Sequence, residues 1–120
     1  MVIFDTNAIL RYILRDDLAM VAEVKGLLLS EVCCIPVEVV AEIVYVLSKT
    51  YGIERNIIAK TLTDIANVST IRVFNSDVVL HALNIFASST LDFVDCLLVG
   101  YAKKEGHRIF TFDKKLQKYL

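Results

Sequence analysis

The chain has 120 residues, of which 56% are hydrophobic, and a formal net charge of −1 at pH 7. This length predicts one domain over residues 1–120, and no apolar stretch reaches the roughly 18 residues that a membrane-spanning helix needs. The charge excludes a generally basic nucleic-acid-binding protein. No N-terminal signal segment is visible, so we expect a cytoplasmic protein with no membrane attachment.

The cysteines argue against disulfides and against a zinc site. There are three, Cys33, Cys34 and Cys96, and two of them are adjacent within an apolar run. An odd number in this arrangement does not form a disulfide framework. The only histidines are His81 and His107 and there is no CxxC motif, so we expect the cysteines to be core residues in a reducing compartment.

Apolar runs alternate with amphipathic segments along the whole chain. We expect four strands, over residues 2–4, 31–35, 70–74 and 108–112. Between the first and second strands we expect helices over 8–14 and from 16–17 to about 30, and between the second and third, helices over 36–51 and 55–67. Helices from 76 or 77 to about 87 and from 92 to about 106 precede the last strand, and a short helix follows residue 113. Strands that are apolar on both sides and separated by helices favour a parallel sheet with helices on both faces. The sequence therefore predicts an α/β fold, a three-layer α/β/α sandwich with a central parallel sheet of four strands, or five.

Two of the predicted strands run directly into an aspartate. Asp5 follows the first strand and Asp113 follows the last one. Because right-handed crossovers place the C-terminal ends of parallel strands at one edge, both carboxylates belong to the edge where ligands bind. The alternative for each is local, since either aspartate could simply cap the helix that follows it.

Glu42 is unusual for its helix. The residues around it, from Val39 to Leu47, are apolar on every side, and such a helix is buried. No basic residue lies three or four positions away, and an unpaired buried carboxylate costs several kcal/mol. The alternatives are an ion pair with a distant Arg or Lys, or an exposed helix face.

Asp92 and Asp95 lie three residues apart at a predicted helix start, and therefore on one face. Asp92 could serve only as the N-cap, and Asp95 only as a favourable charge at the helix dipole. Taken together, carboxylates from two strand ends, one helix start and one helix interior would repel one another without a cation. An all-oxygen ligand set selects Mg²⁺ or Mn²⁺, which typically serve phosphate chemistry.

These acidic motifs resemble those of PIN-domain ribonucleases, above all the VapC-type toxins of toxin–antitoxin pairs. The matching segments, in order, are Asp5-Thr6, Glu42, the run from Asp92 to Leu97, and Thr111-Phe112-Asp113. The resemblance implies Asp5, Glu42, Asp95 and Asp113 as catalytic metal ligands, with Asp92 accessory. Thr6, Asn7 and Thr111 would support these carboxylates without binding the metal themselves. The family commonly adds one more strand after the last acid, whereas only residues 114–120 follow Asp113 here. This difference from the family concerns the outer edge of the sheet.

The resemblance also implies an activity and partners. We expect a Mg²⁺- or Mn²⁺-dependent endoribonuclease that leaves a 3′-hydroxyl and a 5′-phosphate, paired with a small antitoxin protein. The high apolar content indicates a homodimer. Residues 101–120 carry six basic and two acidic side chains, a net +4, against −5 for the rest of the chain. The basic residues that could contact RNA phosphates are Lys103, Lys104, Arg108, Lys114 and Lys115.

Two other functions fit parts of the pattern. A catalytically inert PIN-like module that binds RNA or protein would keep the fold without cleavage, and a metal-dependent cleavage assay separates it from a nuclease. A response-regulator receiver also clusters aspartates. It needs adjacent acids after the first strand and a lysine after the last, whereas Asp5 stands alone at its position.

Overall fold

A computed structural model describes the whole chain, residues 1–120. Helices and short parallel strands alternate in it, which confirms the α/β class. The elements are β1 (Val2–Ile3), α1 (Thr6–Leu14), α2 (Leu18–Ser30), β2 (Cys33–Ile35), α3 (Val37–Tyr45), η1 (Val46–Thr50, a π-helical turn), α4 (Arg55–Ala66), β3 (Ile71–Val73), α5 (Ser76–Ser88), α6 (Phe93–Glu105) and α7 (Lys114–Gln117). The expected helix over 36–51 is thus α3 continued by η1.

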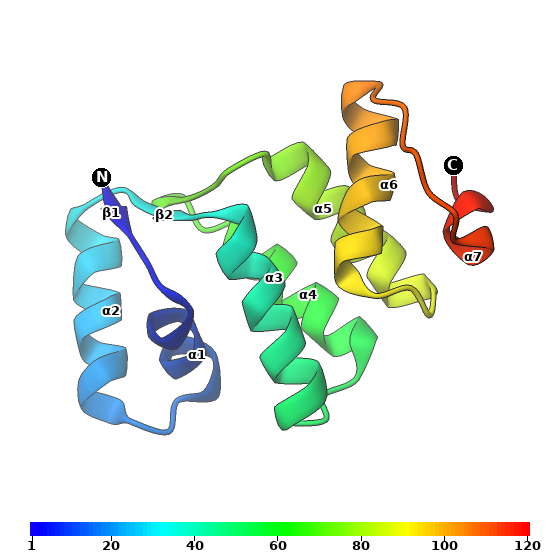
Figure 1. Cartoon of the computed structure of the whole chain (residues 1–120). Coiled ribbons are helices and arrows are strands. Elements are labelled where there is room, and N and C mark those ends of the chain that lie inside the picture. The colour runs from blue at the N-terminus through cyan, green and yellow to red at the C-terminus, as the bar shows by residue number, and fades with distance from the viewer.

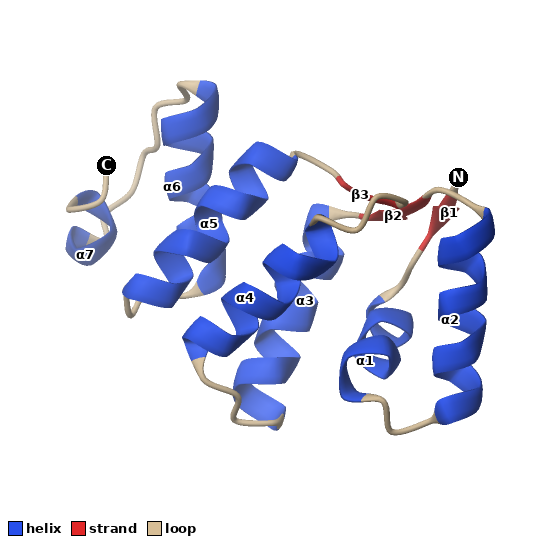
Figure 2. Cartoon of the chain, turned by 180° about the vertical axis from the view of Figure 1, so that it is seen from behind, coloured by secondary structure: helices blue, strands red, loops and turns tan.

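The sheet has three parallel strands in the order β1-β2-β3. Cys33 pairs with Val2 on one side and with Ile71 on the other. All three residues of β2 are buried, because β2 is the central strand and its side chains meet the core on both faces. Figure 2 shows the three strands side by side at one end of the molecule.

The predicted fourth strand over 108–112 is wrong, and so is a sheet of four or five strands. This segment belongs to no strand, and Phe110 and Phe112 are 81% and 87% exposed. Its apolar composition is that of a strand, but a strand also needs a neighbour to bond with. Figure 1 shows the segment running back along α6, away from β1.

The helices stand in a row rather than in two layers around a central sheet. From one end to the other, Figure 1 shows α2, α1, α3 with α4, α5 with α6, and finally α7. The molecule measures 46 × 29 × 18 Å. Its radius of gyration is 14.8 Å, above the about 13.6 Å typical of a compact chain of this length. The chain is therefore elongated, with its N- and C-termini at opposite ends.

One apolar core runs through this row. It comprises 27 buried side chains, from Phe4 near the sheet to Leu116 in α7. Cys33, Cys34 and Cys96 are buried and free, which confirms their prediction as core residues. No helix is long and apolar enough to cross a membrane.

Helix α6 is fixed by features that the sequence displays. Asp92 occupies its N-cap position, and Gly106 ends it with φ of 71°, a left-handed conformation that glycine adopts readily. Inside the helix, Gly100 lies so close to α5 that an added Cβ would be 2.7 Å from the Val78 carbonyl oxygen. The missing side chain lets α5 and α6 pack tightly.

Candidate functional site

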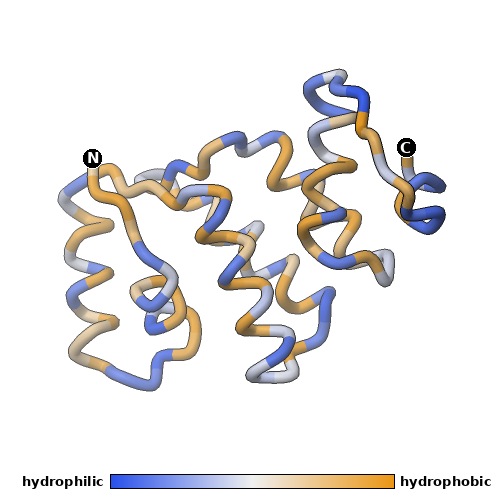
Figure 3. The backbone as a smooth tube through the Cα atoms, in the orientation of Figure 1, coloured by the Kyte–Doolittle hydropathy of each residue, from blue (hydrophilic) through white to orange (hydrophobic).

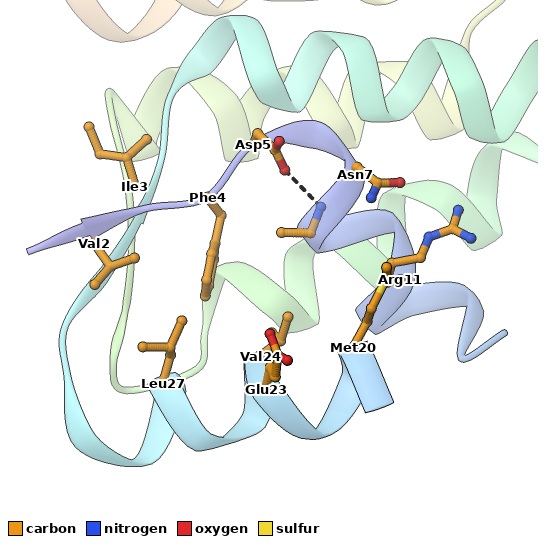
Figure 4. A pocket seen from close by; sticks show the side chains of 11 residues that line it. Val2, Ile3, Phe4, Asp5, Asn7, Arg11, Met20, Glu23, Val24 and Leu27 are labelled. Atoms are coloured by element: carbon orange, nitrogen blue, oxygen red, sulfur yellow. Dashed lines mark hydrogen bonds between the residues drawn. The ribbon is translucent and has the colours of Figure 1, made fainter. Parts of the chain in front are cut away.

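Asp5 lies at the C-terminal end of β1, as predicted. Its Oδ1 accepts a hydrogen bond of 2.9 Å from the Ala8 N–H and so caps α1. It lines a pocket of about 470 Å³ together with Asn7 and Arg11, beside α2. Figure 4 shows the cap and the pocket. Asp5 therefore does cap the helix that follows it, although the cap uses only one carboxylate oxygen.

Asp92 and Asp95 lie together at the start of α6. Asp92 makes no side-chain cap hydrogen bond, and both residues line a second pocket of about 490 Å³. Asp95 is partly buried, and its pKa is raised by desolvation, then by the negative charges of Asp113 and Asp92. Lys115 opposes this shift only in part. The Asp95 carboxyl therefore lies near two other carboxylates, and its burial makes the largest contribution to the pKa shift.

Asp113 joins this group from the other end of the extended segment. Its Oδ1 accepts a 3.0 Å hydrogen bond from the Leu116 N–H and caps α7, while Thr111 Oγ1 accepts the Asp113 N–H at 3.0 Å. Lys115 Nζ donates to the Thr90 carbonyl oxygen, just before α6. These bonds hold α7 against the start of α6, and with it the third carboxylate of the group.

Glu42 is not where the sequence predicts it. It lies on the exposed face of α3, and its carboxylate makes neither a hydrogen bond nor an ion pair. The prediction of a buried glutamate is wrong because the apolar neighbours of Glu42 divide between two faces. Val40, Ile43 and Val44 are buried, whereas Tyr45 is 64% exposed.

The predicted acids do not form one group within the chain. Asp92 and Asp113 lie near Asp95, whereas Asp5 caps α1 and Glu42 lies on the exposed face of α3. No group of three or more acidic, histidine or cysteine side chains is close enough to hold a metal ion. The carboxylates as placed in a single chain therefore do not fit a divalent cation, even though their oxygen chemistry suits one.

A family comparison bears on this arrangement. The chain matches the family model described as PIN domain over residues 2–119. It belongs to the PIN domain family. No curated protein and no solved structure matches the chain. PIN domains are generally nucleases, so the family indicates a nuclease-like fold for this chain.

The residues predicted to support the acids of this PIN domain are placed unevenly. Thr111 contacts the backbone of Asp113, as described above, but the Thr6 and Asn7 side chains make no hydrogen bond. The basic residues predicted to contact RNA are all exposed and lie in the last turn of α6, the extended segment and α7; they are Lys103, Lys104, Arg108, Lys114 and Lys115.

Two cations beside the α6 acids were missed by the sequence reasoning. Lys49 of η1 and Arg55 of α4 line the same pocket as Asp92 and Asp95. Arg55 Nε donates to the Phe86 carbonyl oxygen at 2.8 Å and its second nitrogen donates to the Leu91 carbonyl. Nothing near Arg55 in the sequence marks this role, since both acceptors lie more than 30 residues away. The π-helical turn that carries Lys49 is a feature often found at functional sites.

Proposed function

We propose that this PIN domain is a Mg²⁺- or Mn²⁺-dependent endoribonuclease that hydrolyses RNA phosphodiesters. The observation that carries the proposal is the group of Asp92, Asp95 and Asp113 beside a pocket lined by Lys49 and Arg55. Carboxylate oxygens are the ligand type that Mg²⁺ and Mn²⁺ take, although the three as placed form no complete metal site, and neighbouring basic side chains suit a phosphate backbone. Hydrolysis would leave a 3′-hydroxyl and a 5′-phosphate, as the resemblance to PIN ribonucleases implies.

The catalytic residues in this proposal are Asp5, Glu42, Asp95 and Asp113, with Asp92 accessory. The order of these acids along the chain supports their assignment, since each stands at the position of an acidic motif in PIN-domain ribonucleases. The biological role proposed with this activity is that of a VapC-type toxin. Its partners would be a second copy of the chain and a small antitoxin protein, in the cytoplasm.

Cleavage of a 5′-labelled RNA, followed on a denaturing gel, tests the activity. Wild type should cut in Mg²⁺ or Mn²⁺ and stop on addition of EDTA, and Asp95→Asn should lower the rate by about a hundredfold, as expected for a damaged metal site. Asp64→Asn is a matched control, because this aspartate is exposed on α4 and pairs only with Lys60. Asp92→Asn should lose much less. Equal rates for wild type and Asp95→Asn would contradict the assignment.

The inert binding module remains the second candidate, and one observation favours it: the acids of a single chain form no metal-binding group. Such a module would shift the same RNA in a native gel without cutting it in any divalent cation. Binding by the basic C-terminal residues would weaken steeply with salt in either case, so cleavage alone distinguishes the two functions.

A further inference from the structure

The pocket between α3 and the start of α6 has an apolar wall. It is the pocket of about 490 Å³ described above, and we call it the α3–α6 cleft. Its apolar wall includes Val44, Phe86 and Phe93, all of them buried. The rings of Phe86 and Phe93 meet edge to face, with their centroids 5.7 Å apart. The volume lies within the roughly 300–1,000 Å³ of pockets that hold small organic groups.

Tyr45 lines this cleft with an uncovered ring. It is the last residue of α3 and is 64% exposed, and it directly precedes the π-helical turn η1. No other aromatic ring and no cation of the chain pairs with it. Figure 3 shows hydrophobic and hydrophilic residues interleaved along α3 and at the start of α6, the two elements that border the cleft. The ring is therefore a flat stacking surface that the chain itself does not use.

The two cations of the cleft also have unused hydrogen-bond donors. Lys49 is exposed and forms no ion pair. Arg55 donates from Nε and Nη2 to the carbonyl oxygens of Phe86 and Leu91, whereas its Nη1 makes no hydrogen bond within the chain. The two backbone bonds fix the plane of the guanidinium, so its remaining N–H groups are a preorganised donor. Lys49 is instead a point charge on a flexible stem, which suits a phosphate.

This combination of groups selects among possible occupants. Asp92 and Asp95 line the cleft together with Lys49 and Arg55, so an apolar protein segment would cover charges without giving them partners, which is unfavourable. A small free anion would use the cations but leave the aromatic ring and the apolar wall uncovered. One nucleotide of an RNA chain matches the whole set, because its base has a π face and polar edges and its phosphate carries a negative charge.

A base that stacks on Tyr45 has to be unpaired. Within a duplex, both faces of each base are covered by neighbouring bases, and the base edges are used in pairing. Unpaired bases can instead turn out of the strand, stack on an aromatic side chain and expose their edges to donors. The α3–α6 cleft therefore suits a single strand or a loop, and not a double helix.

We propose that the α3–α6 cleft binds one unpaired base of an RNA strand, with Tyr45 stacked on the base. Arg55 Nη1 donates to an acceptor on the base edge, and Lys49 contacts the adjacent phosphate. Because Asp92 and Asp95 line the same cleft, the bound nucleotide lies next to the phosphodiester that the proposed nuclease cuts. This last step rests on the proposed nuclease function, whereas binding of the base does not. Tyr45 then helps to determine where an RNA is cut.

Binding of a short RNA in EDTA tests the stacking without any cleavage. The probe is a single-stranded RNA with 2-aminopurine at its centre, a base whose fluorescence falls when it stacks on an aromatic ring. Loss of one stacking partner weakens binding by about five- to a hundredfold, so Tyr45→Leu should bind that much less tightly and quench the probe less. Tyr45→Phe keeps the ring and should bind as wild type does. Phe74→Leu, which removes an exposed ring outside the cleft, is the control.

Salt dependence separates the phosphate contact from the stacking. Each phosphate contact adds about 0.7 to the slope of log K against log salt concentration for a single strand. Lys49→Gln should therefore reduce the slope by about this amount, while Tyr45→Leu should lower the affinity at an unchanged slope. Lys60→Gln, which changes an exposed lysine of α4 outside the cleft, is the control. A duplex of the same sequence should bind wild type and Tyr45→Leu equally.

Equal binding of the single strand to wild type and Tyr45→Leu overturns the base site, and so does a wild type that binds no RNA. A dimer that becomes monomeric in Tyr45→Leu by light scattering also overturns it, because a second copy would then cover the cleft. Cleavage in Mg²⁺ keeps the two proposals apart. RNA that binds through Tyr45 and is never cut refutes the nuclease function alone. RNA that Tyr45→Leu cuts with wild-type kcat/KM refutes the base site alone.

Discussion

Replacement of Arg55 tests how the start of α6 is held in place. Arg55 begins α4, and its guanidinium donates to the carbonyl oxygens of Phe86 in α5 and of Leu91 just before Asp92. It also stacks on the Phe86 ring, with its central carbon 3.7 Å from the ring centroid. One side chain therefore ties three helices together and sets the loop that precedes the α6 acids.

The cost of Arg55→Met follows from these contacts. A hydrogen bond to a charged donor contributes about 1.5–3 kcal/mol, and a partly buried cation–π contact about 1 kcal/mol. Because Arg55 is only half-buried, the lower end applies to each of the two bonds, and with the ring contact the loss should be about 4 kcal/mol. That corresponds to a fall of roughly 15 °C in melting temperature for a chain of this length. Arg55→Lys keeps the charge and reaches one carbonyl, so it should lose about half as much.

Urea unfolding followed by circular dichroism measures the loss. Lys60→Met on the same helix is the control. Lys60 pairs with Asp64 at 3.2 Å, but the two side chains are 77% and 64% exposed, and such a pair contributes at most about 0.5 kcal/mol. If Arg55→Met unfolds within about 0.5 kcal/mol of wild type, the contacts of Arg55 do not hold this loop and the reasoning is refuted.

Substitutions at four further positions probe single features of the fold. Asp5→Ala should lower the free energy of unfolding by about 1 kcal/mol through loss of the α1 cap, and Asp5→Asn should not. Gly100→Ala should cost about 1–3 kcal/mol because its Cβ would meet the Val78 carbonyl, whereas Gly26→Ala, with open space around it, should gain about 0.5–1 kcal/mol; denaturant midpoints measure both changes. Burial and two lysines of α6 lower the pKa of His81 from its ordinary 6.5. The unfolded state then binds the proton first, so stability should fall as pH drops below 6.5, and less so in His81→Gln.

Much of the helical structure can be predicted from the sequence because its signals are local. The predicted helix from 92 to about 106 is α6, with Asp92 before it and Gly106 after it. The predicted helix from 55 is α4, which ends at Ala66. Caps, terminating glycines and apolar spacing act within a few residues of one another, so a short stretch of sequence contains the whole cause.

The errors concern features that depend on distant residues. The segment 108–112 has strand composition, but only a neighbouring edge can make it a strand, and the sequence does not say which edge is available. Glu42 has apolar neighbours, but whether its own face is covered depends on how α3 packs. Arg55 has no local signal at all, because its acceptors come from α5 and from the loop after it.

The sequence sets two interpretations of Asp5 and Asp113 against each other, a helix cap and a metal ligand, and the geometry makes them compatible. In both residues the cap hydrogen bond uses Oδ1 alone, to the N–H of Ala8 and of Leu116 respectively. The second oxygen keeps its lone pairs, and the cap fixes the rotamer that directs it. A carboxylate held in this way loses little side-chain conformational entropy when it binds a cation or a phosphate-bound water. Capping is therefore a reason for these aspartates to be well placed for chemistry.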